Sequence, residues 1–134
     1  MSADKTCVVI VSGSLERIQM AAMVASVAAV SGHEVLVFLA MNALSPFIKG
    51  SNTLVPAEGE MGELMRELTG EKKVPDFRML FEQGVELGDM KIYPCAMAMG
   101  VLGVEQQQLE SYVGESTGLA KFLNEARGGQ VWTF

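Results

Sequence analysis

The stretch CVVIVSGS at residues 7–14 carries the pattern that decides the fold class. Its first five residues are apolar and mostly β-branched, which is typical of a strand buried on both faces. Ser12, Gly13 and Ser14 then predict a turn into a helix, with Ser14 as a plausible N-cap. A buried strand that leads directly into a helix is the repeating unit of α/β proteins.

The same order of strand and helix continues along the chain. Apolar runs predict further strands at 34–40, 90–95, 131–134 and, briefly, 111–113. Helical spacing of apolar residues predicts helices at 15–31, 42–48, 61–70, 75–87 and 119–126, with a helical turn at 106–110. This alternation predicts a parallel sheet with helices on both faces. The 134 residues fit one domain, 1–134, with a long connection at 49–74 between helices.

The helix at 15–31 is apolar around most of its circumference from Met20 onward. One sheet face covers a stripe of only about 100° or a little more. We therefore expect the second side of this helix to meet another subunit, so that the protein is a homo-oligomer. A tightly packed monomer is the alternative.

The composition excludes several classes of function. The longest apolar run, 20–30, is too short to span a bilayer, which needs ~20 residues, and no N-terminal signal pattern is visible. A cytoplasmic location is therefore expected. The formal net charge is −6 and the basic residues are scattered, so no nucleic-acid surface is predicted. The single histidine, His33, is expected at the amino edge of the sheet, which argues against zinc and histidine-based catalysis.

Cys95 is the strongest candidate for chemistry. It ends the apolar run at 90–95 and precedes an Ala/Met stretch, which places it at the carboxyl edge of the sheet, where open α/β sheets bind ligands. Unpaired N–H groups and the positive dipole end of a helix favour a thiolate there. A buried, inert cysteine is the alternative for Cys95, and it is the simplest interpretation of Cys7. Two cysteines do not make a disulfide framework.

Residues near the same edge are candidates for binding. Backbone N–H groups of Ser12, Gly13 and Ser14 could hold an anion, although an ordinary turn with a serine cap explains them as well. The chain has no glycine-rich phosphate loop, which argues against a flavodoxin-like nucleotide binder. Met97 and Met99 are interpreted as soft packing around the thiol that shields it from water, because such packing is commoner than a soft-metal site.

Several segments together resemble a known family. They are Val11-Ser12-Gly13, the apolar helix that ends at Gly32, the methionine-containing connection, Cys95-x-Met97-x-Met99-x-Val101-x-Gly103-Val104, and Val113-Gly114 followed by Leu119-Ala120 and Phe122-Leu123. In these residues the chain resembles the DsrE/DsrF-like sulfur-relay (sulfurtransferase) family. The resemblance covers nearly the whole chain, and the cysteine segment is its sharpest motif.

The resemblance implies a three-layer α/β/α sandwich with a five-stranded parallel sheet, assembled as trimers or hexamers. It also implies that the cysteine matching Cys95 takes sulfane sulfur as a persulfide, or thiosulfate as a mixed adduct. This cargo would be exchanged with a small TusA-like carrier in cytoplasmic sulfur oxidation or tRNA thiolation. Neither a metal nor an organic cofactor is implied.

The chain departs from its relatives around the cysteine. Ala96, Ala98 and Gly100 stand where relatives often carry polar residues, and the second downstream cysteine of some relatives is absent. A site with one cysteine can hold and pass sulfur but cannot release it by forming an internal disulfide, which favours a carrier over a catalyst. The alternative is a non-catalytic binding subunit of a sulfur-relay complex, in which Cys95 is structural.

Overall fold

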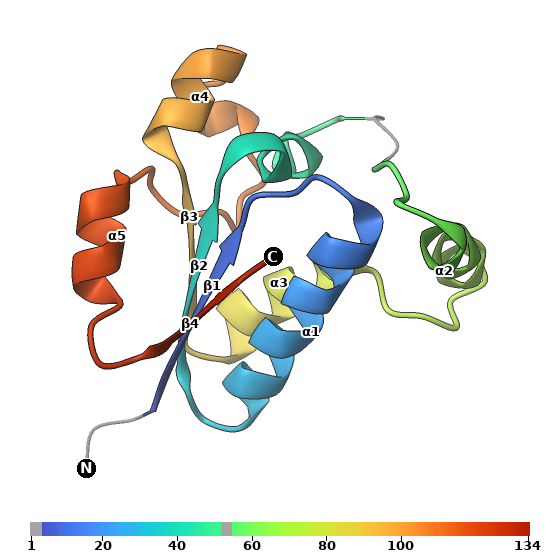
Figure 1. The fold of residues 1–134 in the computed structure, drawn as a ribbon, viewed down its shortest axis with the longest axis horizontal. Coiled ribbons are helices and arrows are strands. Elements are labelled where there is room, and N and C mark those ends of the chain that lie inside the picture. The colour runs from blue at the N-terminus through green and yellow to red at the C-terminus, as the bar shows by residue number, and fades with distance from the viewer. Residues whose placement is uncertain (1–3, 52–54) are drawn as a thin grey trace.

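The computed structural model describes residues 4–51 and 55–134. Four strands form one parallel sheet in the order β3-β2-β1-β4 (Figure 1). The strands are β1, Lys5–Ile10; β2, Glu34–Leu39; β3, Met90–Pro94; and β4, Gln130–Thr133. The predicted α/β class with a parallel sheet is confirmed.

The central strands are the ones with continuous apolar sequences. β1 lies between β2 and β4, and its Cys7 pairs with Leu36 on one side and Val131 on the other. Most residues of β1 and β2 are buried, whereas β4 at the edge is exposed along its length. The middle of the sheet therefore forms the core.

The expectation of five strands is wrong, because the segment at 111–113 is not a strand. The Val113 N–H donates to the carbonyl of Glu110 and closes a turn instead of joining a ladder. The segment then contacts β3 at separate points only, where the Gly114 N–H donates to Ile92 and Thr117 forms an isolated bridge with Cys95. The segment at 111–117 therefore covers the outer edge of β3 but does not add a strand to the sheet.

Helices cover both faces of this sheet (Figure 1). α1 (Leu15–Val30) and α3 (Phe77–Leu87) lie on one face, where Met90 of β3 packs closely on Gly84 of α3. α5 (Leu119–Glu125) lies on the other, where the Phe122 ring is centred 4.9 Å from that of Phe38 on β2. Side chains alternate along a strand, so β3 presents Met90 to the first face and Tyr93 to the second, against Phe122.

The remaining helical segments lie outside these two layers. α4 (Ala96–Leu102) stands at the carboxyl end of β3, and α2 (Glu60–Gly70) lies to the side of α1 (Figure 1). Short 3₁₀ turns occupy Met41–Ala43, Ser45–Phe47 and Gln106–Gln108. The helix predicted at 42–48 is thus two successive 3₁₀ turns. The predicted connection at 49–74 contains α2 where helical spacing placed it, and part of it, 52–54, lies outside the described residues.

α1 leaves a large apolar surface uncovered. Met20, Met23, Val27 and Val30 are exposed on it, and Val30 is 87% exposed. The edge strand β4 adds the exposed Trp132, and a groove of about 430 Å³ runs between α1 and this strand. Within the described residues, no helix is long and apolar enough to cross a membrane.

Candidate functional site

Cys95 lies at the junction of β3 and α4, as its sequence context predicted. Its backbone N–H donates to the Leu39 carbonyl at 2.9 Å, which ties it to the end of β2, and its carbonyl accepts from the Met99 N–H at 3.0 Å in the first turn of α4. The residue is the N-cap of α4 with extended backbone, and it is 7% exposed. The cysteine is thus held rigidly at the carboxyl edge, close beneath the surface.

Thr117 holds Cys95 from the other side. The Thr117 N–H donates to the carbonyl of Pro94 and its own carbonyl accepts from the Ala96 N–H, both at 3.1 Å. These two bonds form the isolated parallel bridge between Cys95 and Thr117. The sequence does not predict this role of Thr117, because nothing in its local pattern shows which strand it will meet.

Because side chains alternate along an extended chain, the Cys95 side chain is expected on the same face of the sheet as that of Tyr93, the face that α5 covers. Tyr93, two residues earlier, points to that face, where its ring packs on Phe122 and its hydroxyl donates to Glu125 at 2.8 Å. Burial, reinforced by the Glu125 carboxylate, raises the pKa of Tyr93 to about 12. The phenol therefore stays neutral at physiological pH and forms an aromatic pair with Phe122 on that face.

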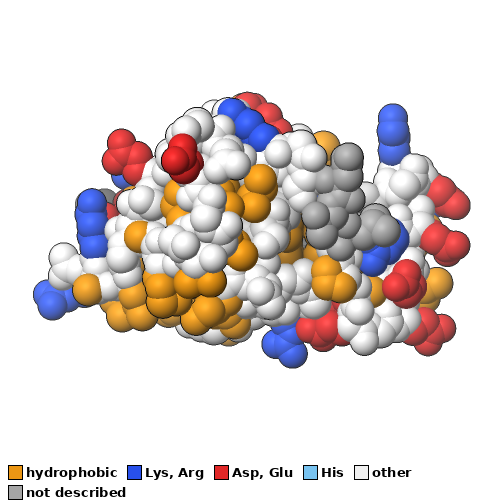
Figure 2. All heavy atoms as spheres, turned by 90° about the horizontal axis from the view of Figure 1, so that it is seen from above, with side chains coloured by type: hydrophobic (Ala, Val, Ile, Leu, Met, Phe, Trp, Pro, Cys, Tyr) orange, Lys and Arg blue, Asp and Glu red, His pale blue; other side chains and the backbone are white. Residues whose placement is uncertain are grey.

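The two methionines after the cysteine have different environments. Met99 is buried in the core, whereas Met97 is 57% exposed. Figure 2 looks onto the carboxyl edge of the sheet and shows hydrophobic side chains gathered in its left half, on the side of α4 and α5. The exposed apolar side chains of these helices are Met97, Val101, Leu102, Leu119 and Leu123. The exposed surface of α4, the helix that begins beside the cysteine, is therefore apolar.

Ser12, Gly13 and Ser14 line a different pocket. It has a volume of about 510 Å³, and its other walls include Asn42, Pro46 and Glu58. Cys95 is not among the described residues that line it. Because β2 separates β1 from β3, the two sites are two strand spacings apart, about 10 Å. The structure therefore places these predicted residues at the same edge as Cys95, but not in one pocket with it.

The serine hydroxyls of this turn are already engaged. The Ser14 N–H donates to the Ser12 hydroxyl, and the Ser14 hydroxyl donates to the Glu58 carboxylate at 2.6 Å instead of capping α1. That bond, together with Arg17, lowers the pKa of Glu58, so a negative charge lies in the pocket. This arrangement disfavours an anion at the turn. Gly13 is needed because a Cβ there would lie 2.8 Å from the Asn42 carbonyl oxygen.

Cys7 and His33 lie far from the carboxyl edge. Cys7 is completely buried within β1, and burial raises the pKa of its thiol. His33 precedes β2 at the amino edge, where its Nδ1 is 2.8 Å from the Thr6 hydroxyl. Among the described residues, no group of three or more His, Cys, Asp or Glu side chains could hold a metal ion.

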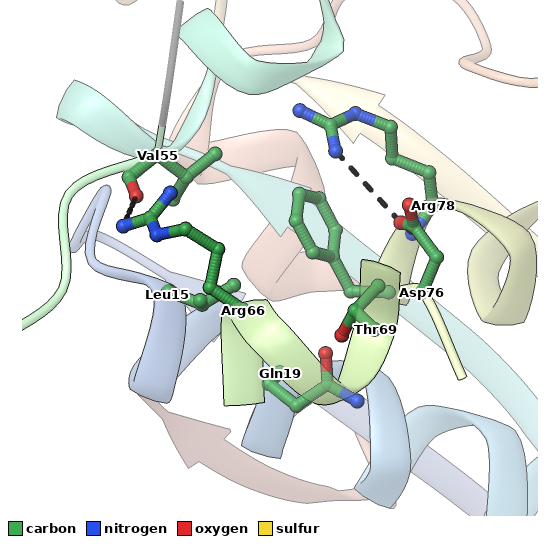
Figure 3. Close-up of a pocket in the computed structure, with 8 residues that line it drawn as sticks. Leu15, Gln19, Val55, Arg66, Thr69, Asp76 and Arg78 are labelled. Atoms are coloured by element: carbon green, nitrogen blue, oxygen red, sulfur yellow. Dashed lines mark hydrogen bonds and ion pairs between the residues drawn. The ribbon is translucent and has the colours of Figure 1, made fainter. Parts of the chain in front are cut away.

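Another pocket lies between α1, α2 and α3 (Figure 3). Its volume is about 180 Å³, and Arg66 and Arg78 face it from opposite sides. Arg66 donates to the Val55 carbonyl and Arg78 pairs with Asp76 at 3.8 Å, so both guanidinium groups have protein partners. We assign this pocket a structural role in holding α2 to the body.

Comparison with known proteins decides the family. The sequence profile of the DsrE/DsrF/DrsH-like family matches residues 53–134, which include β3, Cys95, α4, α5 and β4. The chain belongs to the DsrE/DsrF/DrsH-like family. The sequence resemblance is thereby confirmed, and members of this family act generally in sulfur relay.

A solved structure supports the fold of this family member. The crystal structure of the ychN protein from E. coli matches with a TM-score of 0.61 over 99% of this chain and 100% of that one. The two sequences are 19% identical, so this likeness concerns the fold alone. No curated protein matches the sequence.

Proposed function

We propose that this chain is a sulfur-relay protein that carries sulfane sulfur, or thiosulfate, on Cys95. The observation that carries the proposal is the position of this cysteine, at the carboxyl edge between β3 and α4, in a chain of a sulfur-relay family. Cys7 supports the assignment by contrast, because it is fully buried in mid-strand and its thiol is held neutral. Reactive cysteines need thiolate character and access.

The loading step is an exchange between sulfur atoms. The Cys95 thiolate attacks the outer sulfur of a donor persulfide, and an S–S bond forms on Cys95 as the S–S bond of the donor breaks. The donor leaves as a thiolate with the electron pair of that bond, and the outer sulfur keeps its proton, so no external oxidant is required. With tetrathionate as donor, thiosulfate leaves and a thiosulfate adduct remains on Cys95. Delivery to an acceptor thiolate is the same step in reverse.

The acceptor we propose is a small TusA-like carrier protein in the cytoplasm, serving sulfur oxidation or thiolation. The apolar surface of α4 next to Cys95 supports such docking, because Met97, Val101 and Leu102 are exposed on this helix. Cys7 lies inside the sheet and cannot resolve a persulfide on Cys95 without unfolding. Release therefore requires a thiol from the partner, which makes this chain a carrier more than a self-contained sulfurtransferase.

We further propose that the protein is a homo-oligomer, a trimer or hexamer. The exposed apolar residues of α1 and the uncovered edge strand β4 support this, because both are features that soluble monomers usually hide. Light scattering after size exclusion tests it, with Val27→Glu as a probe in the exposed stripe. A monodisperse wild-type monomer would contradict the proposal.

A second candidate function has one observation in its favour. Cys95 is only 7% exposed, which suits a structural cysteine in a non-catalytic binding subunit. Iodoacetamide separates the two functions: a carrier is labelled at Cys95 in the native state, whereas a structural thiol reacts only after unfolding. Intact-protein mass after polysulfide treatment, compared between Cys95→Ser and Cys7→Ser, then identifies the loaded cysteine.

A further inference from the structure

A buried hydroxyl beside Cys95 has no hydrogen-bond partner. Thr117 is 7% exposed, and its Oγ1 makes no hydrogen bond to any described residue. The great majority of buried polar side-chain atoms in proteins are paired, and an unpaired one costs the full desolvation of the group. Valine would fill the same space on an extended backbone at no such cost. Packing alone therefore does not explain why a hydroxyl is present at residue 117.

The bridge between Thr117 and Cys95 brings their side chains together. In a parallel pair, residues directly opposite each other extend their side chains from the same face of the sheet, one strand spacing, about 5 Å, apart. A sulfur atom bound to Cys95 lies about 2 Å beyond the cysteine sulfur. That extension spans much of the gap, so a carried sulfur atom comes within reach of the threonine hydroxyl.

We propose that the Thr117 hydroxyl donates a hydrogen bond to the sulfur atom carried on Cys95. The inference rests on the proposed function, since it assigns a binding residue for the same cargo. Once the outer sulfur of the persulfide on Cys95 has released its proton to solvent, it bears the negative charge, and hydrogen bonds to charged acceptors are stronger than neutral ones. Thr117 is well placed for this task, because its backbone is fixed to the residues on either side of Cys95.

Few side chains in this neighbourhood compete with Thr117 as hydrogen-bond donors. Ala96, Ala98 and Gly100 of α4 carry no polar side chain, and the Tyr93 hydroxyl is already donated to Glu125. The threonine hydroxyl thus compensates for the polar residues that relatives often carry next to this cysteine. In the protein without bound sulfur, the buried Thr117 hydroxyl has lost its water and gained no hydrogen bond, and the bound sulfur supplies the missing acceptor.

The test compares Thr117→Val, which removes the hydroxyl with little change of shape, with Thr117→Ser, which keeps it. Each protein is loaded with polysulfide, and the decay of the sulfur adduct is followed by intact-protein mass spectrometry, while thermal unfolding is measured in parallel. Thr117→Val should lose its sulfur about tenfold faster than wild type. The same variant should melt about 3 °C or more higher, because an unpaired buried group has been removed. Thr117→Ser should retain sulfur as wild type does.

Tyr112 provides the matched control. Its hydroxyl is also buried without a partner among the described residues, but its ring packs on Phe47, which contacts Phe77 and Phe81 on the α3 side. Tyr112→Phe should raise the melting temperature and leave sulfur retention unchanged.

The outcomes separate the inference from the proposed function. If wild type loads Cys95 and Thr117→Val holds sulfur equally long, the role of Thr117 is refuted while the carrier function stands. If wild type takes no sulfur at Cys95, the carrier function itself fails. Thr117→Ala, which also lacks the hydroxyl, should lose sulfur as fast as Thr117→Val, although it melts lower because it leaves a cavity.

Discussion

Replacing Phe122 with alanine should detach α5 from the sheet. Within α5, whose seven residues are all described, Phe122 alone is buried, and its ring contacts Phe38 and Tyr93 at centroid distances of 4.9 and 6.3 Å. A buried aromatic side chain removes about 150–250 Å² from water, worth about 4–6 kcal/mol, of which alanine keeps a small part. We expect a loss of about 3–5 kcal/mol in the free energy of unfolding.

Urea unfolding and thiol labelling measure this effect. With a urea dependence of about 2 kcal/mol per M, the unfolding midpoint should fall by about 2 M. Cys7 should also react faster with iodoacetamide in native buffer, because it pairs with Leu36 on the face that α5 covers. Phe122→Leu, which refills most of the volume, should lose only about 1–2 kcal/mol. A midpoint shift below about 0.5 M for the alanine variant would refute the reasoning.

Three further outcomes are expected. Gly13→Ala should lower the free energy of unfolding by about 1–3 kcal/mol, because the added Cβ would press on the Asn42 backbone. Gly100→Ala is the control, since a Cβ there lies in open space on α4 and should not destabilise the protein. The urea unfolding midpoints of the two variants measure the difference. Burial raises the pKa of Tyr93 to about 12 from 10.0 for a free phenol, so the folded state keeps the phenol proton to higher pH than the unfolded state. The free energy of unfolding should therefore fall as pH rises from about 10 to 12. Tyr93→Phe should lack this part of the decline. Hydrogen bonds from the backbone N–H groups of Glu58 and Gly59 lower the pKa of Glu16. The stability that Glu16 contributes is therefore present above the ordinary carboxyl pKa and is lost as pH falls through the lower pKa of the folded state. Glu16→Gln should speed hydrogen exchange in α2 at neutral pH.

Much of the fold could be predicted because its central strands, β1 and β2, contain continuous apolar runs. The runs at β1 and β2 are short and rich in β-branched residues, and Gly32 and Gly88 mark where α1 and α3 stop. The sequence at 111–113 wrongly predicts a strand because Tyr and Val favour strands locally. Whether such a short run joins a ladder depends on its tertiary partners, which its own sequence does not specify.

For the candidate site too, the sequence predicted the local features but not those that depend on tertiary structure. The strand–cysteine–helix pattern predicted the edge position of Cys95, because strand ends are local features. The distance between Cys95 and the turn at Ser12–Ser14 depends on strand order, and β2 separates them. The partner Thr117 lies 22 positions further along the chain in an irregular segment, so only the folded structure reveals it.

The central claim, that Cys95 carries sulfur, is tested most directly by the intact mass of native protein after brief exposure to polysulfide. Wild type and Cys7→Ser should gain the mass of one or more sulfur atoms, and a thiol reductant should remove it. Cys95→Ser should gain none. Equal gain in Cys95→Ser and wild type, or no gain in native wild type, would contradict the account.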